Sequence, residues 1–142
     1  MNIDVNKYEK LVVCALEARN HAYAPYSKFK VGAALLCVDG SIFTGCNVEN
    51  ASYSATNCAE RTAFFQAVSE GKKEFEAIAI VGGPADEREM KLCAPCGVCR
   101  QVMREFCNPK NFEIILATNC KEYKVFTLEE MLPVSFGPDN LV

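Results

Sequence analysis

The sequence predicts an α/β protein, a three-layer α/β/α sandwich around a mixed sheet of five strands. Apolar segments with strand character alternate with segments whose apolar residues recur every three or four positions, the spacing of a helix. Residues 75–117 hold a strand, a helix and a second strand in succession, and this βαβ order predicts a parallel strand pair. The link from Ala117 to Tyr123 is too short for a crossover, so the last strand is expected to lie antiparallel to its neighbour.

The chain is expected to begin with a helix followed by a β-hairpin. Residues 5–22 carry apolar side chains at helical spacing, and a proline-containing turn ends the helix. Residues 31–38 are mostly apolar and predict a strand, and Asp39-Gly40 after them is typical of a hairpin turn. Residues 42–46 are the expected antiparallel partner.

A second helix and a buried strand follow. A polar loop over 47–57 leads into the helix, which is expected at 58–70 and is ended by Gly71. Residues 75–81 are apolar enough for a buried strand, and Gly82-Gly83-Pro84 is expected to end it.

The last third of the chain is expected to hold a helix, two strands and an irregular tail. A charged loop over 86–92 precedes the helix, which Pro95 opens and which runs to Phe106. The two strands and the tail, which contains prolines and a glycine, are expected at 112–117, 123–127 and 131–142.

Length and charge limit the functional classes. The 142 residues suit one domain spanning 1–142, and half of them are apolar, which is enough for a sizeable core. A net charge of −3 and the lack of a basic stripe argue against a nucleic-acid partner. No apolar run approaches the length of a membrane span and the first ten residues are too polar for a signal peptide, so a cytoplasmic protein without membrane contact is expected.

Nine cysteines are the one unusual feature of the composition. An odd count without an export signal speaks against a disulfide framework and favours metal ligands together with buried free thiols. Six cysteines fall mostly inside predicted helices and strands and are expected to be structural thiols: Cys14, Cys37, Cys46, Cys93, Cys107 and Cys120. The other three stand in motifs that carry chemistry.

These motifs are Cys58-Ala59-Glu60 and Pro95-Cys96-Gly97-Val98-Cys99, each at the expected start of a helix. Cys-x-x-Cys places two sulfur atoms at one helix end, close enough to bind one ion, and Cys58 supplies a third thiolate. Three thiolates leave the fourth position of a tetrahedral zinc ion open for water, as a catalytic site requires. The positive ends of the two helices would offset part of the thiolate charge.

Two charged residues adjoin Cys58. Glu60 is not needed as a ligand, and it is placed to take a proton from a bound water and return it to the substrate. Arg61 is expected to compensate thiolate charge, the alternative being one arm of a surface salt bridge. The only histidine, His21, lies far from both motifs in sequence and is expected to be a solvated residue at a helix end.

Either motif alone is a weak signal, because redox sites and zinc knuckles also contain Cys-x-x-Cys. The combination of Cys-Ala-Glu with Pro-Cys-x-x-Cys on two helices is much more specific. It resembles the signature of zinc deaminases, in which the glutamate is not a metal ligand.

The whole sequence resembles the small homotetrameric cytidine deaminases, and the resemblance covers nearly the entire chain. Five segments carry it: 24–34 (APYSKFKVGAA), 45–53 (GCNVENASY), 58–63 (CAERTA), 94–101 (APCGVCRQ) and 132–138 (LPVSFGP). One departure is the polar Asn57, where relatives often carry an apolar residue, and it bears on local packing rather than on the ligands.

The resemblance implies a cytidine deaminase-like fold and an activity in pyrimidine salvage. Free cytidine and deoxycytidine would be hydrolysed to uridine and deoxyuridine plus ammonia, with one zinc ion per subunit. It also implies a homotetramer with shared active sites, in which the substrate would be contacted by Phe29, Asn47, Glu49, Ala51, Tyr53, Ala59 and Phe136.

The implied roles differ among these residues. Asn47 and Glu49 would hydrogen-bond the ribose, Phe29 would pack beside the pyrimidine, and the backbone of Ala59 would hydrogen-bond the base. Three would reach the site of another subunit: Ala51, Tyr53 and, from the tail, Phe136. Without the resemblance, each of these residues could equally be an ordinary loop, core or surface residue.

Two other functions stay open at this point. A deaminase acting on RNA or DNA would keep the chemistry and change the substrate, although the acidic charge and the Asn47–Glu49 pair favour a free nucleoside. A non-catalytic zinc module would close the site with a fourth thiolate such as that of Cys93. Glu60 beside the ligands argues for catalysis, since a structural site has no use for a carboxylate there.

Overall fold

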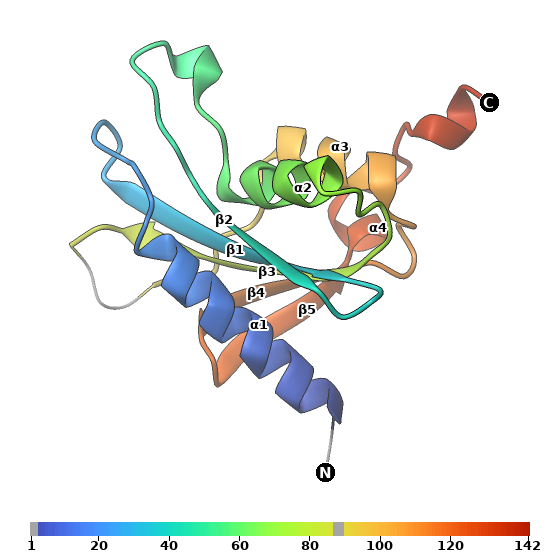
Figure 1. The fold of residues 1–142 in the computed structure, drawn as a ribbon, viewed down its shortest axis with the longest axis horizontal. Coiled ribbons are helices and arrows are strands. Elements are labelled where there is room, and N and C mark those ends of the chain that lie inside the picture. Colours follow the sequence, from blue (N-terminus) through green and yellow to red (C-terminus); the bar gives the residue numbers. More distant parts are fainter. Residues whose placement is uncertain (1–2, 87–89) are drawn as a thin grey trace.

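The computed structural model of the chain describes residues 3–86 and 90–142. Its helices are α1 (Ile3–Arg19), α2 (Ala59–Ser69), α3 (Gly97–Phe106) and α4 (Leu128–Met131), with short 3₁₀ turns at Tyr53–Ala55 and Pro138–Asn140. Its strands are β1 (Phe29–Cys37), β2 (Ile42–Cys46), β3 (Phe75–Pro84), β4 (Glu113–Asn119) and β5 (Glu122–Thr127). Figure 1 shows the helices on both sides of the sheet.

The five strands form one mixed sheet in the order β2-β1-β3-β4-β5. β3 and β4 are parallel, with Ala77 opposite Glu113, and α3 lies in the crossover between them. The other neighbours are antiparallel, including β4 and β5, where Ile115 lies opposite Val125. The predicted βαβ unit and the antiparallel last strand are therefore confirmed.

One face of the sheet is covered by α1 and the other by α2, α3 and α4 (Figure 1). Successive residues of β1 point to opposite faces: Ala34 packs toward α1, whereas Ala33 and Leu35 pack toward α2. Because both faces are covered, the central strands are apolar along most of their length. The predicted three-layer sandwich is confirmed.

A cluster of aromatic rings packs α2 against α3. Phe64 of α2 is 0% exposed, and its ring centroid lies 5.0 Å from that of Phe75, 6.2 Å from that of Phe106 and 6.1 Å from that of Phe112. Phe106 is the last residue of α3. Burial of one such side chain contributes about 2–3 kcal/mol, so this cluster fixes the two helices relative to each other.

The ends of α1 and β3 differ from the prediction. α1 ends at Arg19 rather than residue 22, and the Arg19 guanidinium donates hydrogen bonds to the carbonyls of Lys30, Gly83 and Pro84. β3 continues to Pro84, because Gly82, Gly83 and Pro84 pair with the first residues of β1. The expectation that these residues end the strand is wrong, since tertiary pairing overrides their usual tendency to interrupt one.

The third helix and the tail also differ. α3 begins at Gly97 and not at Pro95, because Cys96 has an extended backbone (φ −68°, ψ 167°) and is the N-cap. The prediction contains no helix after residue 127, whereas α4 forms there. The hydroxyl of Thr127 accepts from the Glu130 N–H, and the Glu130 carboxylate accepts from the Thr127 N–H. This Thr-x-x-Glu capping box was a visible sequence signal for the helix.

The charged loop expected at 86–92 is described in part. Residues 87–89 lie outside the described residues, and Lys91 pairs with Gly82 in an isolated bridge. Within the described part of the chain, no helix is long and apolar enough to cross a membrane.

Candidate active site

The three motif cysteines come together at one point. The sulfur of Cys96 lies 3.8 Å from that of Cys58 and 3.5 Å from that of Cys99, and all three lie within 4.8 Å of one another. Over residues 3–86 and 90–142, this is the only group of three or more potential metal ligands from histidine, cysteine or carboxylate side chains.

Two helix N-termini bring the sulfur atoms together. Cys58 is the N-cap of α2, Cys96 is the N-cap of α3, and Cys99 lies in the first turn of α3. The partly positive helix ends therefore face the thiolates. The first turn of α2 lies so close to β2 that a Cβ atom on Gly45 would come within 2.4 Å of the Ala59 carbonyl oxygen. Glycine at this position is what allows the helix to approach.

The cluster fits a zinc ion in size and in chemistry. Tetrahedral zinc–sulfur bonds of about 2.3 Å place the sulfur atoms about 3.8 Å apart. The separations of 3.8 Å and 3.5 Å from Cys96 to its two neighbours match this requirement. Three thiolates fill three of the four positions, which leaves one for water or substrate.

Cys93 does not belong to the group of three ligands. Its sulfur packs instead against β3, where a Cβ atom on Gly82 would come within 2.9 Å of it. Burial raises the pKa of the Cys93 thiol to about 11. The geometry therefore disfavours a closed site with four thiolates.

Arg61 provides positive charge at the cluster. Its Nη2 atom donates a hydrogen bond to the sulfur of Cys58 over 3.2 Å. Hydrogen bonding from Cys99, followed by the contact with Arg61, lowers the pKa of Cys58 to about 5. Among the described residues, Arg61 forms no ion pair with a carboxylate. This contact favours charge compensation over a surface salt bridge.

Glu60 is buried beside the cluster and is only 5% exposed. Burial, and to a lesser degree the Cys58 thiolate, raises the pKa of the Glu60 carboxyl to about 7. A carboxyl group with a pKa near neutrality can accept a proton and give it back at little energetic cost.

A cavity of about 210 Å³ opens beside the cluster, and its lining includes Asn47, Cys58, Ala59, Glu60 and Cys96. The cavity thus joins the metal ligands, the buried carboxyl and one of the residues implied in ribose binding.

Asn47 is nearly buried, and its side chain forms hydrogen bonds with the backbone of β1 beside the cavity. Its Oδ1 accepts from the Val31 N–H over 2.9 Å, and its Nδ2 donates to the Phe29 carbonyl over 2.8 Å. The second hydrogen on Nδ2 is not used by these two contacts and is available to a ligand.

The other implied substrate contacts line neighbouring hollows. Phe29 lines one of about 490 Å³, which shares Cys93 with the cavity beside the cluster. Glu49 and Tyr53 line another of about 370 Å³, which shares Thr56 with that cavity. One copy of the chain therefore does not gather these residues into a single cavity.

The carboxylate of Glu49 is held in place by the segment before β1. It accepts hydrogen bonds from the backbone N–H groups of Tyr26 and Ser27 and from the Ser27 hydroxyl. The Ser27 hydroxyl bond is the main cause that lowers the pKa of this carboxyl.

Two implied residues stand apart from the cluster in a single copy. Ala51 is exposed, and Phe136 is 59% exposed on the tail. Neither lines the cavity beside the cluster. His21 is exposed just after α1, in agreement with the expected solvated position. All nine cysteines are free thiols, and Cys37 and Cys107 among them are buried.

Some functional candidates are absent from the sequence prediction. Ser27 stands in one of the matched segments but received no role. Three polar residues of α3 donate hydrogen bonds to the segment after β5: Arg100, Gln101 and Arg104. Arg104 follows Gln101 by three residues and Arg100 by four, a spacing that places side chains side by side on a helix surface, and this was the available signal.

Comparison with known proteins identifies the family. Residues 5–115 match the cytidine and deoxycytidylate deaminase zinc-binding region. The cytidine deaminase of Sporosarcina psychrophila is 49% identical over 137 residues, which cover 94% of this chain and 93% of the relative. That of Halalkalibacterium halodurans is 47% identical over 133 residues, covering 94% and 96%.

A solved structure agrees with the sequence relatives. The crystal structure of cytidine deaminase from Burkholderia pseudomallei has a TM-score of 0.79 and 50% identity, over 89% of this chain and 97% of that chain. The chain belongs to the zinc-binding cytidine and deoxycytidylate deaminase family, and Cys58, Cys96 and Cys99 form its zinc site.

Proposed function

We propose that the protein is a zinc-dependent cytidine deaminase, a hydrolase that converts free cytidine and deoxycytidine with water to uridine or deoxyuridine and ammonia. One observation carries the proposal: the buried Glu60 carboxyl, with a pKa of about 7, lines the same cavity as the zinc ligands Cys58 and Cys96. The similarity to relatives named cytidine deaminase over 94% of the chain supports the substrate.

The chemistry divides between the metal and Glu60. Zinc held by the three cysteines supplies a Lewis acid that lowers the pKa of water. Glu60 accepts a proton from the attacking water and passes it to N3 of the pyrimidine as the water oxygen bonds to C4. Glu60 then transfers the second water proton to the amino group, the C4–N bond breaks, and ammonia leaves as the C4 carbonyl forms.

We further propose how this chain holds its substrate. Asn47 presents a free amide hydrogen to the cavity and Glu49 presents an oriented carboxylate, so both can bind the ribose hydroxyl groups. Phe29 packs beside the pyrimidine, and the backbone of Ala59 at the cavity wall hydrogen-bonds the base.

The working form in this proposal is a homotetramer of single-domain subunits, residues 1–142, with one zinc ion each and shared active sites. Tyr53 is 77% exposed and Phe136 is 59% exposed, so both have ring surface available to another copy. Ala51, also exposed, reaches the same neighbouring site. None of the nine cysteines, all of them in the described part of the chain, forms a disulfide, which favours a reducing compartment, the cytoplasm, as the place of action in pyrimidine salvage.

The test is a deamination assay on the zinc-loaded protein, with cytidine beside cytosine-containing oligonucleotides and with or without a chelator. We expect turnover of cytidine that the chelator abolishes and added zinc restores. Preference for the oligonucleotides would instead assign the site to a nucleic-acid deaminase. Zinc binding without turnover of any of these substrates would overturn the enzymatic proposal.

A further inference from the structure

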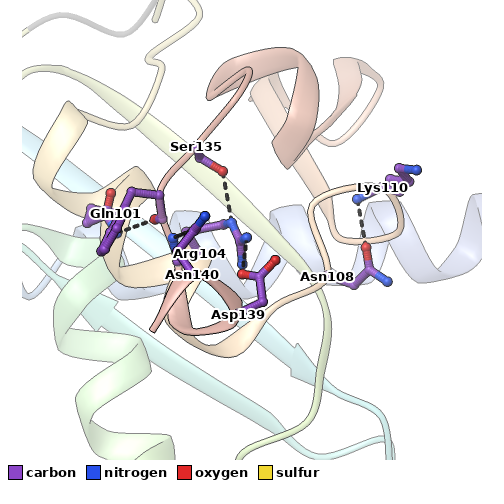
Figure 2. A network of polar contacts seen from close by, with 9 residues as sticks. Gln101, Arg104, Asn108, Lys110, Ser135, Asp139 and Asn140 are labelled. Atoms are coloured by element: carbon purple, nitrogen blue, oxygen red, sulfur yellow. Dashed lines mark hydrogen bonds and ion pairs between the residues drawn. The ribbon is translucent and has the colours of Figure 1, made fainter. Parts of the chain in front are cut away.

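The tail after α4 is fastened to the exposed side of α3 by three polar contacts (Figure 2). Gln101 Nε2 donates to the Phe136 carbonyl over 2.9 Å. Arg104 Nε donates to the Ser135 hydroxyl over 2.8 Å, and Arg104 Nη2 pairs with Asp139 over 2.5 Å. The guanidinium of Arg104 thus bridges two tail residues on either side of Phe136.

Gly137 lies flat against the same guanidinium. A Cβ atom built on Gly137 would come within 2.3 Å of Arg104 Cζ and within 2.4 Å of its Nη1. The φ angle of Gly137 is −152°, which any residue adopts, so a larger residue here is limited by space and would have to displace the Arg104 guanidinium. The Gly137 N–H donates to Asn140 Oδ1 over 2.8 Å, which closes the turn that carries Asp139.

These contacts fix the backbone on both sides of Phe136 and leave its ring outward. The side chain of Arg104 is 11% exposed, whereas Phe136 is 59% exposed. The tail therefore holds an aromatic ring in a defined position that its own chain does not use. Restricting a contacting group before it binds lowers the entropic cost of binding.

We propose that Arg104 is a positioning residue: it holds the tail so that Phe136 enters the active site of a second copy of this chain. The inference rests on the proposed function, in which Phe136 contacts a neighbouring subunit's substrate. Arg104 itself touches only the tail and acts through Phe136. The N-cap of α3 is Cys96 and its first turn contains Cys99, so one helix supports its own zinc site and the site of a neighbour.

The first test separates binding from chemistry. Arg104→Ala is expected to raise KM for cytidine roughly three- to tenfold with kcat and zinc content unchanged, because the loss falls on substrate contact. Arg104→Lys should lie between, since its single nitrogen keeps the charge but cannot occupy both donor positions that Nε and Nη2 fill toward Ser135 and Asp139. Glu105→Ala is the matched control, because Glu105 is exposed on the same helix and makes none of the tail contacts.

A double-mutant cycle tests the contact itself. Gly137→Ala should displace the Arg104 guanidinium and raise KM as Arg104→Ala does. In the Arg104→Ala background the added methyl group meets no guanidinium, so Gly137→Ala should have little further effect. If Gly137→Ala raised KM by the same factor with and without Arg104→Ala, the two effects would be independent and the proposal would be contradicted.

Mixed assemblies show whether the effect acts between copies. Subunits with Arg104→Ala keep an intact Glu60, whereas Glu60→Gln subunits are inactive but keep an anchored tail. Co-assembly of the two should restore a low KM, because the Glu60→Gln subunits donate a positioned Phe136. If the KM of the mixture stays as high as that of Arg104→Ala alone, the arginine acts within its own subunit and the proposal is wrong.

A reporter independent of catalysis separates this inference from the proposed function. The chain contains no tryptophan, so Phe136→Trp introduces a single indole whose fluorescence can be excited selectively. Its emission should be that of a buried indole in the assembled protein and should shift to the red when Arg104→Ala is added. The shift, together with no cytidine turnover by the wild-type protein, would overturn the proposed function and keep the positioning role. Cytidine turnover without the shift, and with wild-type KM in Arg104→Ala, would overturn the positioning role alone.

Discussion

Arg61 Nη2 lies 3.2 Å from the sulfur of Cys58, and the buried Nε of the same guanidinium has no hydrogen-bond partner among the described atoms. Three thiolates around one divalent zinc leave a net negative charge, and this guanidinium is placed to offset it. The contact places the positive charge of Arg61, a residue of α2, directly beside the zinc ligand Cys58.

Replacement of Arg61 should therefore weaken metal retention. Arg61→Ala is expected to accelerate zinc loss to a chelator roughly 10-fold or more, the usual cost of removing a group that orients and neutralises a ligand. Arg61→Lys, which keeps the charge but loses the planar donor, should lose zinc at an intermediate rate. Equal rates of loss for all three proteins would show that Arg61 does not support the thiolate.

Glu60→Gln should separate metal binding from proton transfer. The amide has nearly the same shape but cannot accept a proton, so kcat should fall roughly 10²–10⁴-fold while zinc content stays at one per subunit. Metal analysis and steady-state kinetics on the same preparation check both points. Activity near that of the wild type would remove Glu60 from the proton-transfer role.

Cys93 provides the test of the closed-site alternative. Its sulfur packs against Gly82 and is outside the group of three ligands, so Cys93→Ser should keep its zinc. Cys99→Ser, which removes a ligand from the first turn of α3, should lose it. Zinc stoichiometry after dialysis compares the two, and equal metal loss in both would favour a four-thiolate structural site.

Gly45→Ala should disturb the position of α2. The new Cβ atom would lie 2.4 Å from the Ala59 carbonyl oxygen and 2.6 Å from the Ala63 nitrogen, and backbone atoms cannot rotate away. We expect the free energy of unfolding to fall by about 1–3 kcal/mol. Gly97→Ala is the control, because nothing lies within 4 Å of its added methyl group. Urea unfolding of both variants distinguishes a steric effect from a general glycine effect.

The elements that sequence predicted best are those that local signals determine. The strand at 42–46 was placed correctly because the Asp39-Gly40 turn and a short apolar run define it within a few residues. The end of β3 was misplaced because Gly82-Gly83-Pro84 is extended through pairing with β1, a contact between segments far apart in the chain.

The same distinction applies to the site. Cys58, Cys96 and Cys99 follow from spacing and helix starts, and the structure brings them together. The proposed contact of Phe136 with the substrate does not follow from one chain, because Phe136 is 59% exposed and does not line the cavity beside its own cluster. The role of Arg104 was not predicted for a similar reason. Its partners Ser135 and Asp139 are more than thirty residues away in the chain, so no local pattern indicates the contact.

Asn47 has a structural role beside its proposed role in ribose binding, and Asn47→Asp tests the structural role through pH. In the wild type, Nδ2 donates to the Phe29 carbonyl over 2.8 Å while Oδ1 accepts from the Val31 N–H. An ionised aspartate would place a second acceptor against that carbonyl in a nearly buried position, which costs free energy. A protonated aspartic acid could still donate there.

The folded-state pKa of Asp at position 47 should therefore lie above its unfolded value of about 3.9. The folded state then binds more protons than the unfolded state, so its stability is greatest below the unfolded pKa and falls as pH rises through the folded pKa. The deficit in unfolding free energy of Asn47→Asp relative to the wild type should widen as the pH rises above about 4, the unfolded pKa, and should level off above the folded pKa. Asn47→Ala cannot titrate, and its deficit should stay constant over the same range. Urea unfolding at each pH measures both, and a deficit in Asn47→Asp that does not change with pH would mean that Asn47 is not a donor to Phe29 in the folded protein.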